Sequence, residues 1–553
     1  YQRRVRAIMT QQKKFQLSET RMRHIQELIN ANPNNPAIPR PMGRLMGSLT
    51  TLYKIGLGPS SSHTMGPNYA AIRFKQMHPD AERYEVTLYG SLAQTGVGHR
   101  TDWAIKQQLG EAKTQILFRA DVRMIPHTNG MLFAAFQQDK LLGRSVWFSV
   151  GGGTLLDGSV ADADNLISIN TTQEELDHIV PPTPANAIKP NHFQYPFNDF
   201  NEHVQYCIAQ NVTLPQLVFK IENEPILKKY GVAENMWYVF NKADCSNFVG
   251  VTEHLIQQHL RQVWRAMKEC VEEGLTKTQD IETSGVLKYP RRAFNRFESA
   301  KKAKKNTVQQ SILLLDAFAL AASEQNASAS GYVVTAPTCG AAGVMPGVLY
   351  YYFYQMSPQL KTFKNGEYVE NLMIEALAVA GVIGNVCRKN ASISGAEAGC
   401  QAEVGVAQAM AAAAATWLEM RLKKSTDEKY SLKQSLSNIE FAARDSLKHN
   451  LGMTCDPING LVVDPCIGRN AVAANAAYAS AQRAITGTFD TVTSFDCVVT
   501  CMYVTGLEMH QHYRETAEGG LAKFYVMDAY KGNEVEFTGQ TFAGQGDKDI
   551  EEM

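Results

Sequence analysis

A proline-rich stretch at residues 181–199 divides the chain into two parts with different sequence patterns, and no other feature constrains the fold as strongly. Five prolines lie in this stretch, which favours an extended linker because proline lacks a backbone donor and fixes φ. Before it, the apolar runs at residues 84–88 and 146–150 end close to glycines, as strands do. After it, long segments rich in alanine and leucine predict helices.

We therefore expect a multidomain chain in which an N-terminal α/β (α+β) domain precedes a larger all-α domain. A length of 553 residues suits two or three domains. The expected divisions are an N-terminal helical arm at 1–45, the α/β domain at 46–180, the linker at 181–199, the all-α domain at 200–530 and a C-terminal tail at 531–553. The main helices of the second domain are expected at residues 309–325, 368–389, 402–423, 436–449 and 470–484.

Composition argues against several classes of function. Lys plus Arg (54) equals Asp plus Glu (54), so the chain has no excess positive charge for counterion release, and we expect no nucleic-acid partner. No run of about 20 apolar residues is present, so we expect no membrane span. Ten cysteines are too few for a disulfide scaffold in a chain of this size, which favours a reducing, cytoplasmic setting.

The segment at residues 58–67, GPSSSHTMGP, places four hydroxyl groups and one imidazole between two Gly/Pro pairs. The hydroxyl-bearing residues are Ser60, Ser61, Ser62 and Thr64. A helix is expected to begin near Asn68, and hydroxyls and N–H groups at a helix N-terminus suit a carboxylate or a phosphate. His63 could act there as a general base. The same residues could equally form a helix cap with an exposed histidine.

Three cysteines, Cys400, Cys455 and Cys466, lie in loops rich in glycine and proline. Residues 455–466 are interrupted by prolines and a glycine, so they cannot form one helix and could bring two thiolates together. The spacing is not that of a ferredoxin, and both a metal site and simple packing remain open. Cys339, in the small-residue turn at 335–343, is expected to pack. The cysteines in helical contexts are expected to fill the core: Cys207, Cys245, Cys270, Cys387, Cys497 and Cys501.

Taken together, these motifs resemble those of the iron–sulfur-dependent L-serine dehydratases (L-serine ammonia-lyases), over residues 47–521. In the first domain the resemblance rests on GPSSSHTMGP at 58–67, LYGSLAQTGVGHRTD at 88–102 and SVGGG at 149–153. In the second domain it rests on LKYPRRA at 287–293, VVTAPTCGAAG at 333–343, NASISGAEAGCQAEVGVA at 390–407, and HNLGMTCDP with PCIGRNA within 449–471.

The resemblance implies an oxygen-sensitive enzyme that converts L-serine to pyruvate and ammonia. It implies a [4Fe–4S] cluster held by Cys400, Cys455 and Cys466, with one iron not ligated by a protein cysteine and with no pyridoxal phosphate. It also implies a substrate-binding α/β domain, an all-helical cluster domain and a homodimer. His63 would be the catalytic base. The residues expected to hold the substrate are Ser60, Ser61, Ser62, Thr64, Thr338 and Arg469.

The sequence departs from the family pattern at three places. Residues 339–342 read Cys-Gly-Ala-Ala where Asn-Gly-Ala-Cys is usual, Gly468 stands where a glutamate is common, and residues 523–553 contain no cysteine. Two alternatives therefore stay open. The same cluster chemistry could act on L-threonine or L-cysteine, or the chain could be a non-catalytic iron–sulfur or amino-acid-sensing relative.

Overall fold

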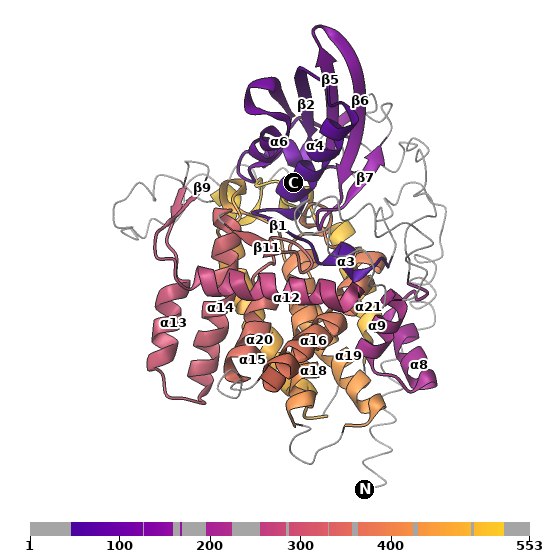
Figure 1. Cartoon of the computed structure of the whole chain (residues 1–553), viewed down its shortest axis with the longest axis vertical. Coiled ribbons are helices and arrows are strands. Elements are labelled where there is room, and N and C mark those ends of the chain that lie inside the picture. The colour runs from indigo at the N-terminus through magenta and orange to yellow at the C-terminus, as the bar shows by residue number, and fades with distance from the viewer. Residues whose placement is uncertain are drawn as a thin grey trace, which may run out of the picture.

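The computed structural model places a small sheet-containing domain on top of a larger helical domain (Figure 1). It describes residues 46–124, 127–158, 166–168, 195–223, 255–283, 287–329, 331–356, 363–423, 430–487 and 492–524. The expected helical arm at 1–45, residues 181–194 of the expected linker and the expected tail at 531–553 lie outside these ranges, so those predictions stay predictions.

The upper domain is built on a five-stranded sheet in the order β3-β2-β5-β6-β7. β2 is parallel to β3 and antiparallel to β5, and the remaining pairs are antiparallel. The five strands are β2 (Arg83–Tyr89), β3 (Thr114–Arg119), β5 (Gly130–Gln137), β6 (Lys140–Ser149) and β7 (Leu155–Gly158). A separate antiparallel pair joins β4 (Val122–Met124) to β8 (Leu166–Ser168). The strand predicted at 84–88 is confirmed within β2, and the strand predicted at 146–150 is confirmed except for its last residue, because β6 ends at Ser149.

Two helices, α4 (Gly66–Met77) and α6 (Thr101–Leu109), pack against this sheet. α5 (Gly90–Gln94) follows β2 directly. Alternate residues of β2 are buried, so Val86 and Leu88 meet Phe74 of α4 and Ile105 of α6 in one apolar core. The helix predicted near Asn68 begins at Gly66 and is preceded by a π-helical turn at Ser61–Met65. Such turns are rare and occur often at functional sites.

The lower domain is a layered helical assembly around α18 (Val406–Lys423), whose alanines 411–415 are completely buried. Small side chains let neighbouring helices approach α18 closely on several sides. The surrounding helices that touch α18 are α15 (Val344–Met356), α16 (Phe363–Asn390), α19 (Leu432–Lys448) and α20 (Cys466–Ala484). The outer helices are α8 (Phe200–Gln210), α9 (Leu214–Asn223), α12 (Leu255–Gly274), α13 (Ala293–Lys302), α14 (Val308–Ser328), α17 (Gly395–Ala398), α21 (Phe495–Glu508) and α22 (Gly520–Phe524). The five main predicted helices correspond to α14, α16, α18, α19 and α20.

The first described residues belong to the lower core. Leu49 and Leu52 of α3 (Leu49–Leu52) pack among the buried residues of the helical domain. β1 (Ile55–Leu57) pairs antiparallel with β11 (Tyr332–Val334). The helical domain also contains the short pair β9 (Ile281–Thr283) and β10 (Leu287–Tyr289). Residues 46–57, expected at the start of the α/β domain, therefore tie the chain to the helical half before it enters the sheet.

Two further expectations meet the structure here. Among the described residues, one segment, Tyr368–Asn390 of α16, is long and apolar enough to span a membrane, and 83% of its most apolar window is buried inside the protein, as in a core helix.

The prediction that Cys497 and Cys501 fill the core is wrong, because both are exposed on α21. α21 turns Val498 and Met502 inward instead. Cys207, Cys270 and Cys387 are buried as predicted, and Cys245 lies outside the described residues.

Candidate active site

The two domains meet where the SSSHT segment of the upper domain faces the cysteine-bearing loops of the lower domain. The side-chain amide of Asn326 on α14 donates to the carbonyl oxygen of Pro59 at 2.8 Å. His127 of the upper domain lies 3.2 Å from the carboxylate of Glu397 on α17. Gly151 has so little space that an added Cβ would lie 3.2 Å from the Cβ of Ser394. The domains are therefore in direct contact around this site.

The SSSHT segment holds its shape with its own hydroxyl groups. The backbone N–H of His63 donates to Ser60 Oγ at 3.1 Å, and the N–H of Ser60 donates to Thr64 Oγ1 at 3.1 Å. Thr64 Oγ1 in turn donates to the carbonyl oxygen of His99 at 2.6 Å. Ser61 and Ser62 are buried in the same turn. Ser60 and Thr64 thus build the loop, and the substrate contacts predicted for all four residues stay predictions.

His63 is completely buried, and its contacts define its tautomer. Ser91 Oγ donates to the carbonyl oxygen of Glu515 at 3.0 Å, so it receives the proton of His63 Nε2, which lies 3.1 Å away. The lone pair of His63 Nδ1 then faces Ser62 Oγ at 2.8 Å and Glu515 Oε1 at 3.5 Å. Burial, and then the neighbouring His99, lower the pKa of His63 well below its usual value. His63 is therefore a neutral imidazole at physiological pH, and the alternative of an exposed histidine is wrong.

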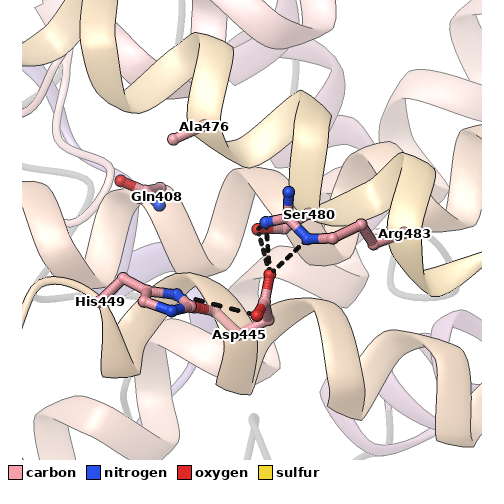
Figure 2. A pocket seen from close by; sticks show the side chains of 6 residues that line it. All are labelled: Gln408, Asp445, His449, Ala476, Ser480 and Arg483. Atoms are coloured by element: carbon pink, nitrogen blue, oxygen red, sulfur yellow. Dashed lines mark hydrogen bonds and ion pairs between the residues drawn. The ribbon is translucent and has the colours of Figure 1, made fainter. Parts of the chain in front are cut away.

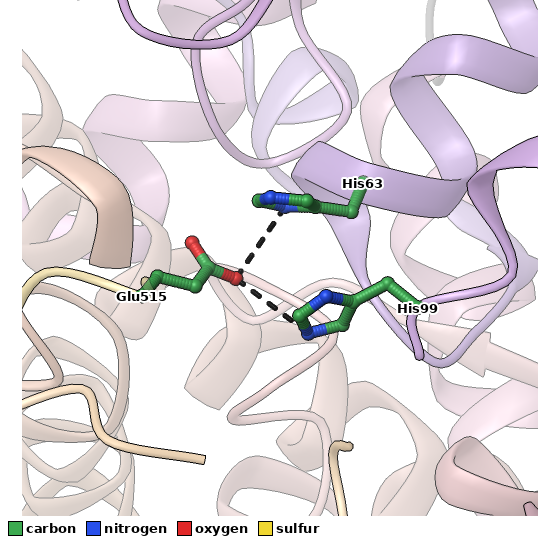
Figure 3. Close-up of side chains that lie close together, drawn as sticks. All are labelled: His63, His99 and Glu515. Atoms are coloured by element: carbon green, nitrogen blue, oxygen red, sulfur yellow. Dashed lines mark ion pairs between the residues drawn. The ribbon is translucent and has the colours of Figure 1, made fainter. Parts of the chain in front are cut away.

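A second histidine and a glutamate complete this cluster, and neither was predicted from the sequence. Figure 3 shows His63 and His99 from the upper domain converging on Glu515 from the lower domain. The two imidazole rings lie 4.6 Å apart, and His99 Nε2 lies 3.9 Å from Glu515 Oε1. His99 lies within the 88–102 segment that carries the family resemblance. Glu515 lies outside the segments quoted above, and the folded chain identifies it.

The three predicted cysteines come from separate segments and lie together. Cys400 directly precedes the π-helical turn Gln401–Gly405, and Cys466 begins α20. Cys455 lies between α19 and α20, where its N–H donates to the carbonyl oxygen of Tyr513 at 2.8 Å and its carbonyl accepts from the N–H of Glu515 at 2.9 Å. Burial raises the pKa of the Cys455 thiol well above its usual value, and the nearby Cys400 and Cys466 contribute to the increase.

These thiols form a suitable donor set for an iron–sulfur cluster. Burial also raises the pKa of Cys400, to about 11, and that of Cys466. Thiols with raised pKa values keep their protons unless a metal replaces them. Sets of buried cysteines without other ligands favour iron–sulfur clusters or zinc. Arg469 supplies the nearby positive charge and lowers the pKa of the Cys400 thiol.

Arg469 and Thr338, both predicted to bind substrate, lie on the lower side of the site. Arg469 donates to the carbonyl oxygen of Thr454 at 2.7 Å and to Asp456 Oδ1 at 2.9 Å, so it braces the loop that carries Cys455. Thr338 lies beside the carboxyl group of Glu403, but its buried hydroxyl completes no hydrogen bond among the described residues. Their substrate contacts stay predictions.

Glu403 is another ionisable residue of the site, besides His99 and Glu515, that was not predicted from the sequence. Burial raises its pKa to about 7, against a smaller lowering by Thr338. It raises the pKa values of the three cysteines and of Glu515, so it lies near both groups. An added Cβ at Gly395 would meet Glu403 Oε2 at 2.9 Å and Cys455 Sγ at 3.2 Å. The lack of a side chain at position 395 therefore leaves room for the carboxyl group and the thiol beside it.

Cys339, which departs from the family pattern, is a buried packing residue at the edge of the site. The charged groups that influence its pKa are Glu403, which raises it, and the buried Lys54, which lowers it; burial raises it most. The three clustered cysteines have no such influence on Cys339. The turn at 335–343 therefore contributes Thr338 to the site and Cys339 to the packing below it.

Comparison with known proteins agrees with this two-part architecture. Residues 48–112 match the family model of the serine dehydratase beta chain, and residues 209–522 match that of the serine dehydratase alpha chain. The chain is 32% identical over 525 residues to L-serine dehydratase 1 of Escherichia coli, covering 86% of this chain and 99% of the relative. It is 31% identical over 523 residues to the L-serine dehydratase of Haemophilus influenzae, with the same coverage. The L-serine dehydratase of Streptomyces coelicolor is 32% identical over 520 residues, which cover 86% of this chain and 98% of that protein. The chain belongs to the serine dehydratase family, with the beta and alpha domains joined in one polypeptide.

Proposed function

We propose that this protein converts L-serine to pyruvate and ammonia by removing the α-proton and the hydroxyl group of the substrate. One observation carries the proposal. Glu515 contacts the buried, neutral His63 through its side chain and the cysteine-bearing loop at Cys455 through its backbone. Glu515 therefore links the imidazole proposed as the base to the segment that carries one of the three thiols, at the junction of the two domains. The names of the relatives support L-serine as the substrate.

We propose that Cys400, Cys455 and Cys466 hold a [4Fe–4S] cluster in which one iron lacks a protein cysteine. When bound, such a cluster supplies a Lewis acid that helps the hydroxyl group leave. The chain contributes three deprotonated thiols in a buried site, and Arg469 compensates part of their negative charge. No pyridoxal phosphate is needed in this scheme.

His63 takes the α-proton at Nδ1. Its other nitrogen is held by Ser91, so the ring cannot rotate without breaking that contact, and the lone pair stays directed into the site. A base must approach within about 3 Å of the proton that it removes. The imidazolium that forms then lies beside Glu515 Oε1, at 3.5 Å, and its positive charge favours ionisation of that buried carboxyl group.

The remaining residues position the substrate. Ser61 and Ser62, with the N–H groups of their turn, face the carboxylate of serine, whereas Ser60 and Thr64 keep the turn in shape. The buried Thr338 hydroxyl, beside the carboxyl group of Glu403, hydrogen-bonds a polar group of the substrate. Water leaves first, and the aminoacrylate then tautomerises and hydrolyses to pyruvate and ammonia.

Turnover of protein prepared without oxygen tests the substrate. L-Serine, L-threonine and L-cysteine are compared by the keto acid that each gives, and L-serine is expected to have the highest kcat/KM. Addition of L-serine is also expected to perturb the visible absorbance of the iron–sulfur cluster. A higher kcat/KM for threonine or cysteine would assign the site to that substrate instead, and no keto acid from any of them would favour a non-catalytic relative.

Single substitutions test the cysteines. Cys400→Ala, Cys455→Ala and Cys466→Ala are each expected to lose cluster absorbance and activity together. Cys497→Ala is the matched control, because Cys497 is exposed on α21, and it should keep both. A variant among the three that retains full iron content and activity would remove that cysteine from the ligand set.

The assembly and setting are proposals of the same kind. We propose a homodimer that works in a reducing, cytoplasmic environment without nucleic acid or membrane. Light scattering after size exclusion tests the dimer, with an expected mass twice that of the 61.2 kDa chain. A mass equal to one chain at micromolar concentration would exclude it.

A further inference from the structure

Three side chains that can ligate a metal converge at the domain junction. One ligand atom from each of His63, His99 and Glu515 lies within 4.8 Å of the other two, and the three side chains are buried. Figure 3 shows both rings directed towards the same carboxylate oxygen. His63 Nδ1 has Ser62 Oγ at 2.8 Å as a hydrogen-bond partner, a contact that a bound ion would replace.

The tautomers of the two histidines follow from their other contacts. His99 Nδ1 lies 3.0 Å from the carbonyl oxygen of Thr95, which can only accept, so Nδ1 carries the proton and Nε2 carries the lone pair. His63 Nε2 carries the proton towards Ser91, so its lone pair is on Nδ1. Burial lowers the pKa of both imidazoles, which keeps them neutral. Neutral imidazoles with fixed outer hydrogen bonds are the form in which histidine binds metals.

The separations suit one metal ion. Zinc binds nitrogen and carboxylate oxygen at about 2.0–2.2 Å, so tetrahedral ligands lie about 3.4 Å apart. His63 Nδ1 lies 3.5 Å from Glu515 Oε1, and His99 Nε2 lies 3.9 Å from the same atom. Small rotations of the side chains would bring all three into the first coordination shell.

The carboxylate has a free position as well. Glu515 Oε2 is buried and makes no hydrogen bond among the described residues. The backbone of Glu515 is fixed by the carbonyl of Cys455 and has a left-handed conformation with φ of 61°, which is unusual for a residue other than glycine. Such backbone strain is found where a side chain must be held at a functional position.

We propose that His63, His99 and Glu515 form a site for one divalent transition-metal ion, separate from the three cysteines. Zn²⁺ is the ion that suits these ligands best. Two neutral imidazoles and one carboxylate are borderline ligands that suit zinc, while cysteine thiolates suit an iron–sulfur cluster. Because the ion occupies His63 Nδ1, it excludes substrate, and zinc is a competitive inhibitor. The competition rests on the proposed function, whereas binding of the ion does not.

Zinc uptake by the anaerobic holoenzyme tests the site. The protein is equilibrated with buffered micromolar Zn²⁺, freed of unbound ion, and its zinc and iron are counted in the same sample. One zinc for each chain with unchanged iron is expected. Zinc X-ray absorption is expected to give nitrogen and oxygen neighbours at about 2.0–2.2 Å and no sulfur at about 2.3 Å. No zinc uptake, loss of iron on uptake or sulfur neighbours would overturn the proposal.

Variants assign the ligands. His99→Ala and Glu515→Gln are each expected to weaken zinc binding at least tenfold and to weaken zinc inhibition against L-serine to the same extent. The second variant keeps the size of the side chain in case the first does not fold. His449→Ala is the control, since its Nδ1 contacts the carbonyl four residues earlier as that of His99 does, but it lies on the exposed end of α19. Equal zinc binding by wild type and both site variants would contradict the assignment. Tight zinc binding without inhibition would instead contradict the role of His63 as base.

Discussion

Two buried carboxylates in this protein, Asp445 and Glu515, have opposite surroundings. Asp445 on α19 accepts hydrogen bonds from Ser480 at 2.9 Å and from Arg483 at 3.1 and 2.5 Å, in a pocket of about 470 Å³ (Figure 2). Glu515 instead meets two neutral histidines, and a further carboxyl group, Glu403, raises its pKa.

The electrostatic consequences differ accordingly. Burial raises the pKa of Asp445, but the hydrogen bonds and charge of Arg483, with Ser480, outweigh it and the net shift is downward. Burial raises the pKa of Glu515 well above its usual value, and Glu403 adds to the increase. Asp445 is therefore a charged carboxylate with hydrogen-bond partners and a cation beside it, as in a structural ion pair. No cation among the described groups offsets the burial of Glu515, so its neutral form is favoured.

The largest expected effect is on catalysis, at the site formed by Glu515 and the two histidines. His63→Ala should lower kcat by about 10²–10⁴-fold, the usual contribution of a general base, while iron content stays at the wild-type value. His449→Ala, beside Asp445, should change kcat less than twofold. Anaerobic kinetics with iron analysis measures both. A kcat for His63→Ala near that of wild type would show that another group removes the proton.

The next effect is on stability, at Asp445. Asp445→Asn should lower the free energy of unfolding by about 1–3 kcal/mol, since it weakens charge-assisted hydrogen bonds to Arg483 and Ser480, while kcat stays unchanged. Because the folded pKa of Asp445 is depressed, its charge stabilises the protein above the unfolded value of about 3.9 and stops doing so as pH falls through the folded pKa. Urea unfolding at pH 7 and at lower pH tests this. A difference that grows towards acid pH would contradict it.

The corresponding substitution at Glu515 should lower kcat and leave the free energy of unfolding almost unchanged, which is the opposite of the result expected for Asp445→Asn. Glu515→Gln should alter the free energy of unfolding by less than about 1 kcal/mol, because burial opposes the charge that it removes. It should lower kcat about tenfold or more, since an amide cannot stabilise the imidazolium of His63. The same urea and kinetic assays apply. A large loss of stability with normal kcat would make Glu515 a structural residue like Asp445.

The smallest effect concerns pH. His63 has a pKa held well below 6.5 by burial and by His99, so it stays neutral and active as pH falls through 6.5. The kcat/KM for L-serine should therefore be almost the same at pH 6 as at pH 7 and should fall only at lower pH. A pH–rate profile of the wild type measures this. An acid limb centred at pH 6.5 or above would mean that the base is exposed to water.

The sequence predicted those parts of the site that lie in continuous motifs. Cys400, Cys455 and Cys466 each stand in a distinctive segment, and the fold brings them together. The two-domain division followed from a change in periodicity, and the main helices of the second half followed from long runs without proline. These features are local, so they can be predicted from the sequence without knowledge of the fold.

What could not be predicted depends on contacts between distant segments. Neither Glu515 nor Glu403, although Glu403 lies in the segment at 390–407, was predicted as a site residue, because only packing shows that one faces two histidines and the other lies near the thiols. The use of Ser60 and Thr64 to build their own turn is likewise invisible until the backbone is placed. The exposure of Cys497 and Cys501 was missed because neighbouring positions on one helix face opposite directions.

The hydrogen bond from Ser91 to the backbone of Glu515 joins two segments that are synthesised far apart in time. Ser91, which contacts His63 Nε2, is separated by 424 residues from the carbonyl of Glu515 to which it donates. The ribosome makes the upper domain long before it makes this partner, so a nascent chain lacks one of the contacts around His63. The site described above is therefore complete only after nearly all of the described polypeptide has been synthesised.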